Sequence, residues 1–273
     1  MFARRVAGTA LAPHWCMRRG RVLLSLVGIV ILLRVADGQA VNDHRRSERF
    51  YVTTSRDEVA SLIAAASPAD LALLEKLNRA DETHLGRLPA VVVPISWTDD
   101  ELTYSVLPRR YAAAHASPTF LVVYLPGQLF GAYEFGTLVR WGPISSGGRA
   151  SPSSPGFFNL NWRSPGRSST VNPDWFMRWY FNFGNREGLA FHAYALPGYP
   201  ASHGCIRLLD RDAQWLYEWG SSWLVDSRIR ILAPGTPVLL VGEYDFGAPP
   251  PWRSTDWLSR EVELPPAARL TTP

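Results

Sequence analysis

Residues 191–208 read FHAYALPGYPASHGCIRL, and both the expected fold and the expected chemistry follow from this stretch. One extended run ends near His192, a Pro-Gly pair turns the chain, and a second extended run begins near Cys205. A neighbouring imidazole can take the proton of a thiol and leave a reactive thiolate. The pattern therefore predicts a cysteine nucleophile, Cys205, with His192 as its general base.

The residues beside Cys205 fit such a site. In an extended segment His203, Cys205 and Arg207 face the same side. Gly204 has no side chain, so the amides of residues 204 and 205 can approach a substrate oxygen and form an oxyanion hole. Arg207 can hold a substrate carboxylate through a pair of parallel hydrogen bonds. We therefore expect a site for an acyl substrate that carries a carboxylate.

Two other interpretations of these residues stay open at this point. His192, His203 and Cys205 could be three ligands of a zinc ion, although no fourth ligand lies close by in the sequence. Alternatively, two core histidines could lie beside a buried structural cysteine. A segment so rich in Gly, Pro and Ser fits that second alternative poorly.

The basic charge of the chain is concentrated in its first 40 residues. The whole chain carries a formal net charge of +4, but residues 1–40 hold six arginines and one acidic residue. The remaining 22 basic and 23 acidic residues nearly balance, which argues against nucleic-acid binding.

Residues 22–33 are uncharged, follow Arg18-Arg19-Gly20-Arg21 and precede a run of small residues. This pattern predicts a signal peptide over residues 1–40, with Met17 as a second candidate start.

A signal peptide implies an exported protein, in the periplasm or the cell envelope. Twelve apolar residues make about 18 Å of helix, well short of a hydrocarbon core of about 30 Å. We therefore expect contact with the membrane only where this segment stays uncleaved. Cleavage removes Cys16 and leaves Cys205 without a partner for an internal disulfide. A lone thiol in an oxidising compartment suggests a chemical role.

The rest of the chain divides into segments that differ in composition and in the spacing of their apolar residues. A strand over 50–54, helices over 56–65 and 69–77 and a strand over 90–94 predict a βααβ unit within residues 50–95. Residues 96–118 are interpreted as a connection, and residues 243–273 as a Pro-rich tail along the surface. Between them, residues 119–242 have the pattern of a mainly β domain. The expected strands are 120–125, 129–135, 138–141, 157–162, 175–183, 189–194 and 236–241.

Two local features of this β domain carry expectations of their own. Within 175–183, alternate residues from Trp175 to Phe183 are apolar, which predicts a single aromatic face toward the core. After Leu208, Asp210 is expected to cap a helix that carries a buried stripe and ends near Gly220.

The stretch Ser202-His203-Gly204-Cys205-Ile206-Arg207-Leu208, with His192 ten residues before it, resembles the signature of the L,D-transpeptidase catalytic domain, the YkuD family. Residues 123–128 and 132–134 resemble the opening strands of that family. Residues 145–147 and 152–158 resemble its Ser-x-Gly and Thr-Pro-x-Gly-x-Phe region, with Ser154 where Thr is usual. The resemblance implies an L,D-transpeptidase-like β-sandwich with a short helix after the catalytic motif.

The resemblance also implies roles and partners. Cys205 would attack the carbonyl at the L-centre of a diamino acid in a peptidoglycan stem peptide, expel a terminal D-alanine, and pass the acyl group to an amine. His192 would be the base, with its far ring nitrogen held by the carbonyl of Ala193. Gly204 and His203 would orient the reacting groups, and Arg207 and Ser202 would bind substrate. The acceptor would be a second stem peptide or a wall-anchored protein; no metal, cofactor or nucleic acid is expected.

Two alternatives from other functional classes go with this hypothesis. A hydrolase of the same fold, an L,D-carboxypeptidase or a cross-link-releasing amidase, would differ only in what accepts the acyl group. A non-catalytic wall-binding protein would have no need of a reactive thiol.

Residues 50–95 resemble, more loosely, a LysM peptidoglycan-binding repeat. The resemblance rests on Leu74–Arg79, Leu85-Gly86 and the run from Leu88 to Pro94. The Gly-Asp-Thr-Leu-like opening of that family is replaced by the run from Ser55 to Val59. The resemblance implies a small LysM-like module, and a structural prodomain is the alternative.

Overall fold

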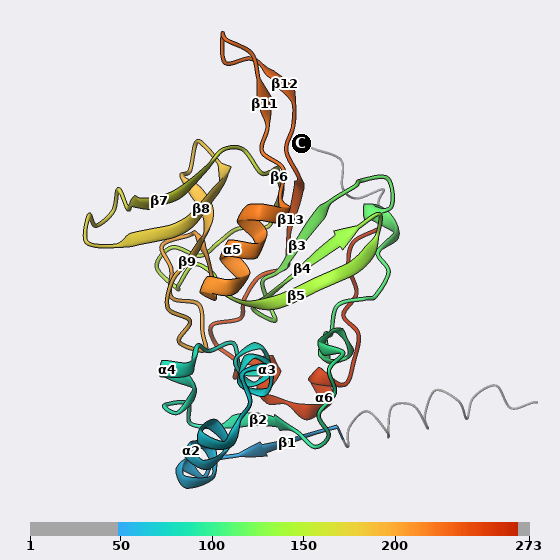
Figure 1. Ribbon diagram of the computed structural model, residues 1–273, viewed down its shortest axis with the longest axis vertical. Helices are drawn as coiled ribbons and strands as arrows, with labels where there is room; N and C mark the ends of the chain where they lie inside the picture. The colour runs from blue at the N-terminus through green and yellow to red at the C-terminus, as the bar shows by residue number, and fades with distance from the viewer. Residues whose placement is uncertain (1–48, 267–273) are drawn as a thin grey trace, which may run out of the picture. The chain divides into compact units, whose positions relative to one another are not determined.

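The computed structural model describes residues 49–266, so the signal segment expected over residues 1–40 lies outside it. The described chain is mainly β, as the sequence predicts, with one large sheet and short helices around it (Figure 1). Among the helices within residues 49–266, none combines the length and the apolar composition that crossing a membrane requires.

The first elements form the predicted βααβ unit with one additional short helix. Strands β1 (Phe50–Thr53) and β2 (Val91–Pro94) pair antiparallel. Serine side chains cap the next two helices, because Ser55 and Ser67 each accept a hydrogen bond from an amide in the first turn. The helices are α2 (Arg56–Ala65), α3 (Pro68–Asn78) and the unexpected α4 (Glu82–Leu85). Residues 49–95 are called the helical module below.

A nine-stranded sheet dominates the described residues, in the order β6-β13-β3-β4-β5-β10-β9-β8-β7. Strands β3, β4 and β5 form the predicted meander, and Phe135 and Gly136 turn β4 into β5 with φ angles of 46° and 76°. Two such residues in succession are the requirement of a tight two-residue hairpin. The strands are β3 (Phe120–Tyr124), β4 (Leu129–Glu134), β5 (Thr137–Ser145), β6 (Gly156–Asn159), β7 (Arg163–Ser168), β8 (Phe176–Gly184), β9 (Leu189–Ala193), β10 (Ile206–Leu208) and β13 (Pro237–Val241).

The two halves of this sheet enclose a hydrophobic core, which gives the sandwich expected from the sequence. Apolar side chains from β3, β4 and β13 meet those from β8, β9 and β10, and helix α5 (Asp210–Trp219) adds its buried stripe. Figure 1 shows α5 between the green strands of one half and the yellow strands of the other. The core includes Leu121, Phe130, Ile144, Phe181, Phe191, Leu208, Leu216 and Leu240.

Strand β8 does not keep the alternation that its sequence predicts. Trp179 has a left-handed backbone with a φ of 54°, and the pairing of β8 with β9 is irregular around it. Because this bulge adds a residue, Met177 and Tyr180 lie together in a small cluster beside Cys205, whereas Phe181 lies in the sandwich core. The expected single aromatic face is therefore wrong.

Helix α5 begins with a different cap from the one expected. Its N-cap is Leu209, which makes no side-chain cap, and Asp210 is already the first helical residue. The carboxylate of Asp210 instead lies 2.8 Å from the guanidinium of Arg178. After α5, strands β11 (Leu224–Val225) and β12 (Ile231–Ala233) form a small hairpin that projects beyond the sheet (Figure 1).

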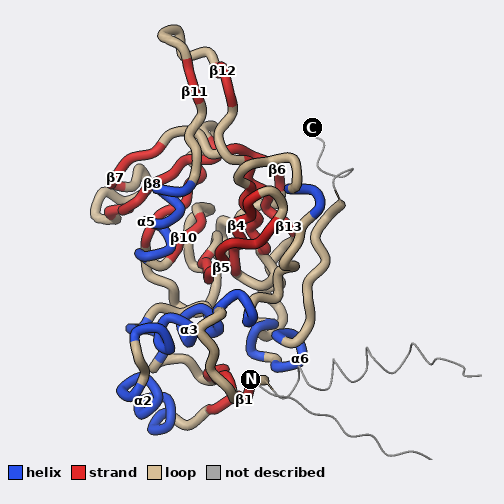
Figure 2. Tube along the Cα trace, turned by 45° about the vertical axis from the view of Figure 1, so that its right-hand side comes forward, coloured by secondary structure: helices blue, strands red, loops and turns tan. Residues whose placement is uncertain are grey.

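The outer face of β3, β4 and β5 is covered by segments from both ends of the described chain. The helical module, residues 96–118 and the C-terminal segment form one apolar cluster with this face. Figure 2 shows α3, α6 and β1 gathered at this end. The covering segments include η1 (Glu101–Tyr104), η2 (Ala112–Ala114), η3 (Pro251–Arg253) and α6 (Thr255–Leu258). Trp252 is 1% exposed, so the expected surface tail is wrong for this part.

Candidate active site

Strands β9 and β10 bring the predicted catalytic residues together. They pair in parallel, with Arg207 opposite His192, and Cys205 is the residue just before β10. Parallel partners need a crossover, so residues 194–205, called the site loop below, travel back to the start edge of β9. The Pro197-Gly198 turn is only one bend in this longer path, and not the simple reversal that the sequence suggested.

His192 is buried and held by a backbone carbonyl. Its Nδ1 lies 3.1 Å from the carbonyl oxygen of Ala193, so a proton on Nδ1 leaves Nε2 as the acceptor. Burial lowers the pKa of His192 from 6.5 to about 4, and the positive charge of Arg207 acts in the same direction. The imidazole is therefore neutral at neutral pH, in the form that can accept a proton.

The thiol of Cys205 is partly buried beside the end of the β8–β9 turn. Its Sγ donates a hydrogen bond to the carbonyl of Gly188 over 3.7 Å. Burial raises the pKa of the Cys205 thiol, and the amide of Ala190 and the charge of Arg207 oppose this only in part. Among the hydrogen bonds of residues 49–266, none joins Sγ to the His192 ring. The resting pair is thus a neutral thiol and a neutral imidazole, and not the thiolate that the sequence pattern suggested.

The chain around Cys205 is shaped by its own serine and glycine. Gly204 has a φ of 108°, a conformation that favours glycine. Its amide donates to Oγ of Ser202 over 3.1 Å, and the Ser202 hydroxyl donates to the carbonyl of Cys205. Ser153 donates to the carbonyl of Gly204 over 2.7 Å. The Ser202 hydroxyl therefore stabilises the loop, and the amide of Cys205 is the remaining candidate for the expected oxyanion hole.

A cavity of about 300 Å³ opens over these residues. The ring of His203 packs against Trp175, with centroids 4.9 Å apart and planes tilted by 43°, and the guanidinium of Arg207 lies 4.7 Å from the ring centre of Tyr194. Arg167 lies 5.0 Å from the ring centre of Tyr180. The lining includes His192, Ser202, His203, Cys205 and Arg207 together with Trp162, Arg167, Met177, Tyr180 and Tyr194. The cavity thus combines a thiol, two imidazoles and two guanidinium groups.

Several lining residues were missed at the sequence level. Arg167 lies on β7, whose sequence RSPGRS has no apolar alternation to mark a strand. Met177 and Tyr180 reach the cavity only because of the β8 bulge.

Within residues 49–266, no group of three or more His, Cys, Asp or Glu side chains is arranged to hold a metal ion.

Comparison with known proteins identifies the segment that carries this site. Residues 118–240 match the YkuD family, the L,D-transpeptidase catalytic domain. This L,D-transpeptidase domain contains His192, Cys205 and Arg207, so the recognition made from the sequence is confirmed for it. The LysM-like resemblance of the helical module stays a prediction. No curated protein sequence matches the chain.

Several solved L,D-transpeptidases are similar to part of the chain. One from Stackebrandtia nassauensis has 22% identity and a TM-score of 0.39, over 47% of this chain and 58% of that one. One from Xylanimonas cellulosilytica has 32% identity and a TM-score of 0.36, over 46% and 61%. One from Mycobacterium tuberculosis has 22% identity and a TM-score of 0.36, over 46% and 58%. The chain therefore covers less than two thirds of each of these structures.

Proposed function

We propose that the protein is an exported peptidoglycan L,D-transpeptidase that forms a thioester on Cys205. The observation that carries the proposal is the shared cavity of Cys205, His192 and Arg207 inside the segment that matches the L,D-transpeptidase domain. The donor is a stem peptide whose diamino acid supplies the acyl group. The acceptor is an amine of a second stem peptide or of a wall-anchored protein.

The acylation step starts from the neutral pair. As Sγ of Cys205 attacks the carbonyl at the L-centre of the diamino acid, Nε2 of His192 takes the thiol proton. The carbonyl π electrons move to oxygen, and the amide of Cys205 stabilises the resulting oxyanion. When the tetrahedral intermediate collapses, the C–N bond breaks and His192 returns the proton to the leaving amine of D-alanine. A thioester and a neutral imidazole remain.

In the second half of the reaction, His192 takes a proton from the acceptor amine and returns it to the sulfur. The acceptor amine attacks the thioester carbonyl, and His192 removes the proton that the amine loses on forming the new amide bond. The C–S bond then breaks, and the sulfur regains the proton from the imidazolium. Burial of His192 supports this cycle, because a ring that is neutral at rest is ready to act as a base at each half.

Arg207 and Arg167 give the cavity its preference for carboxylates. Each guanidinium group lies over an aromatic ring, and a guanidinium can bind a carboxylate through two parallel hydrogen bonds. A stem peptide carries carboxylates close to the scissile bond. We assign to Arg207 the carboxylate nearest Cys205, since it follows that residue on the same strand face.

The test is acylation of the native protein by a carbapenem, whose strained carbonyl imitates an acyl donor. We expect a mass increase of one intact carbapenem at neutral pH, located on the peptide that contains Cys205 and absent from Cys205→Ala. A native protein that stays unmodified, while its denatured form reacts readily with iodoacetamide, would identify a structural cysteine and refute the proposal.

Muropeptide analysis separates the transferase from the hydrolase. Cells that contain the wild-type protein should accumulate direct links between two diamino acids, and cells with Cys205→Ala should lack them. Shortened stems without such links would identify an L,D-carboxypeptidase instead. A metal assay on the purified protein addresses the zinc alternative, because a zinc site would bring stoichiometric metal that His192→Ala loses.

A further inference from the structure

The site loop is tied to the helical module at one aspartate. The amide of Leu196 donates to Oδ2 of Asp81 over 2.7 Å, and the amide of Asp81 donates to the carbonyl of Leu196 over 3.0 Å. Ala80 and Pro197 form an isolated antiparallel bridge beside this pair. Leu196 itself is fully buried. The module thus holds the site loop through both backbone groups of Leu196.

The two carboxylate oxygens of Asp81 have different partners. Oδ1 serves the module, because it accepts hydrogen bonds from the amide of His84 over 3.1 Å and from the hydroxyl of Thr83 over 2.6 Å. It also lies 2.7 Å from Nδ1 of His84. Oδ2 serves the site loop through Leu196. One side chain therefore caps helix α4 and anchors the loop at the same time.

The anchored part of the loop supports the cavity wall. Tyr194 lies two residues before Leu196, and its ring lies under the guanidinium of Arg207. The same ring has its centroid 6.0 Å from that of His192. A shift of Leu196 would move Tyr194 and release Arg207 from its fixed orientation. The sulfur of Cys205 is held separately, by the Gly188 carbonyl and by the loop contacts of Ser202 and Gly204.

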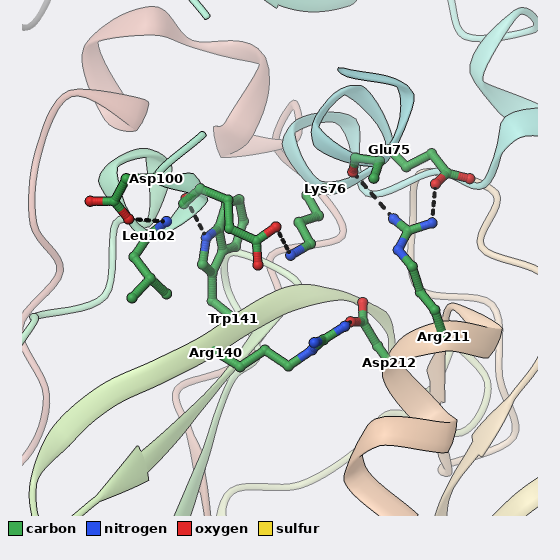
Figure 3. A network of polar contacts seen from close by, with 10 residues as sticks. Glu75, Lys76, Asp100, Leu102, Arg140, Trp141, Arg211 and Asp212 are labelled. Carbon is green, nitrogen blue, oxygen red and sulfur yellow. Dashed lines mark hydrogen bonds and ion pairs between the residues drawn. The ribbon is translucent and has the colours of Figure 1, made fainter. Parts of the chain in front are cut away.

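The module can serve as a rigid anchor because one ion pair fixes it to the catalytic domain and a second fixes it to the connection over residues 96–118. Figure 3 shows Glu75 and Lys76 of helix α3 directed to opposite sides. Oε2 of Glu75 pairs with Arg211 of α5 over 2.5 Å, and its Oε1 accepts the amide of Glu82 at the start of α4 over 2.8 Å. The buried Lys76 pairs with Glu101 over 2.6 Å. Helices α3, α4 and α5 are thereby linked around Asp81.

We propose that Asp81 is a positioning residue of the acyl-transfer site, which holds Tyr194 and Arg207 in place through Leu196. The inference rests on the proposed function. It predicts that loss of the contact between Oδ2 of Asp81 and the Leu196 amide slows the acylation of Cys205 by substrates that Arg207 must orient. It also predicts that the intrinsic reactivity of the thiol is unchanged, because Asp81 does not reach Cys205.

Three substitutions separate this role from that of a helix cap. Asp81→Ser keeps a good cap but is too short to reach Leu196, Asp81→Ala loses both contacts, and Asp81→Asn keeps one oxygen that can accept the Leu196 amide. Thr83→Ala is the matched control, since it removes a partner of Oδ1 only. For each variant we would measure Tm, the rate of carbapenem acylation, and the rate of alkylation by iodoacetamide.

We expect Asp81→Ser and Asp81→Ala to be acylated ten to a hundred times more slowly than wild type, with Asp81→Asn in between and Thr83→Ala unchanged. The rate of alkylation by iodoacetamide should stay within about twofold of the wild-type rate in every variant, because none of the substitutions removes a contact of the Cys205 sulfur. The Tm should follow a different order, with Asp81→Ser above Asp81→Ala.

Acylation rates that follow Tm across the series, with Asp81→Ser near wild type, would show that Asp81 is only a cap and overturn the inference. Acylation and alkylation that fall together would overturn it as well, because the loss would then lie in the thiol. A wild-type protein that forms no carbapenem adduct would instead refute the proposed function.

Discussion

Acidification should leave acylation nearly unchanged until His192 is protonated. Burial lowers the pKa of His192 from 6.5 to about 4. At about 1.4 kcal/mol for each pKa unit, this shift is a preference of about 3 kcal/mol for the neutral ring. At pH 5.5 a ring with a pKa of 4 is about 97% neutral, whereas a ring with the ordinary pKa of 6.5 is about 9% neutral. The base should therefore work at pH 5.5 almost as well as at pH 7.

The assay is the rate of carbapenem acylation, followed by intact mass between pH 4 and pH 8, with the folded fraction checked by circular dichroism at each pH. The raised pKa of the Cys205 thiol keeps it protonated across this range, so the base and not the thiolate population sets the rate. A tenfold fall between pH 7 and pH 5.5 in folded protein would refute this reasoning. It would mean that His192 titrates as it does in water, or that a thiolate is the resting nucleophile.

Three further changes test the site and its support. His192→Ala should slow carbapenem acylation by about 10² to 10⁴, the usual contribution of a positioned base, without abolishing alkylation of the thiol. Gly204→Ala should cost about 1–3 kcal/mol in urea unfolding, because a φ of 108° strains any residue with a Cβ. Arg140→Ala should cost about 3–5 kcal/mol, since it leaves the fully buried carboxylate of Asp212 without its partner. The double variant with Asp212→Asn should recover part of that stability.

The sequence was most informative where chemistry and local pattern coincide. The motif predicted that His192 and Cys205 lie close together, and both line one cavity, with His192 opposite Arg207 in the parallel register of β9 and β10. Apolar runs bounded by turn residues predicted strands β3 and β4, and helical periodicity predicted helices α2 and α3. These features depend on neighbours within a few residues, so a single sequence is enough to find them.

Other parts depend on contacts between distant residues and leave no local signal. The bulge at Trp179 inverts the faces of β8, and nothing in an aromatic run marks which residue will adopt a positive φ. Strand β7 is polar and forms only because β8 offers it an edge. The anchor between Asp81 and Leu196 joins residues far apart in the chain, and Asp81 alone looks like an ordinary helix cap. The thiol pKa depends on burial, which the motif does not encode.

The burial of Trp252 affects when the helical module can complete its packing during synthesis and folding. Its ring lies beside the guanidinium of Arg79, which is fully buried, and the hydroxyl of Tyr111 donates to the carbonyl of Pro265 over 2.7 Å. The ribosome makes the helical module before its packing partners around Trp252, which lie much later in the chain. Contacts of such long sequence separation form slowly, because a large loop must close first. The helical module therefore has to wait for the residues around Trp252 before its apolar face is fully covered.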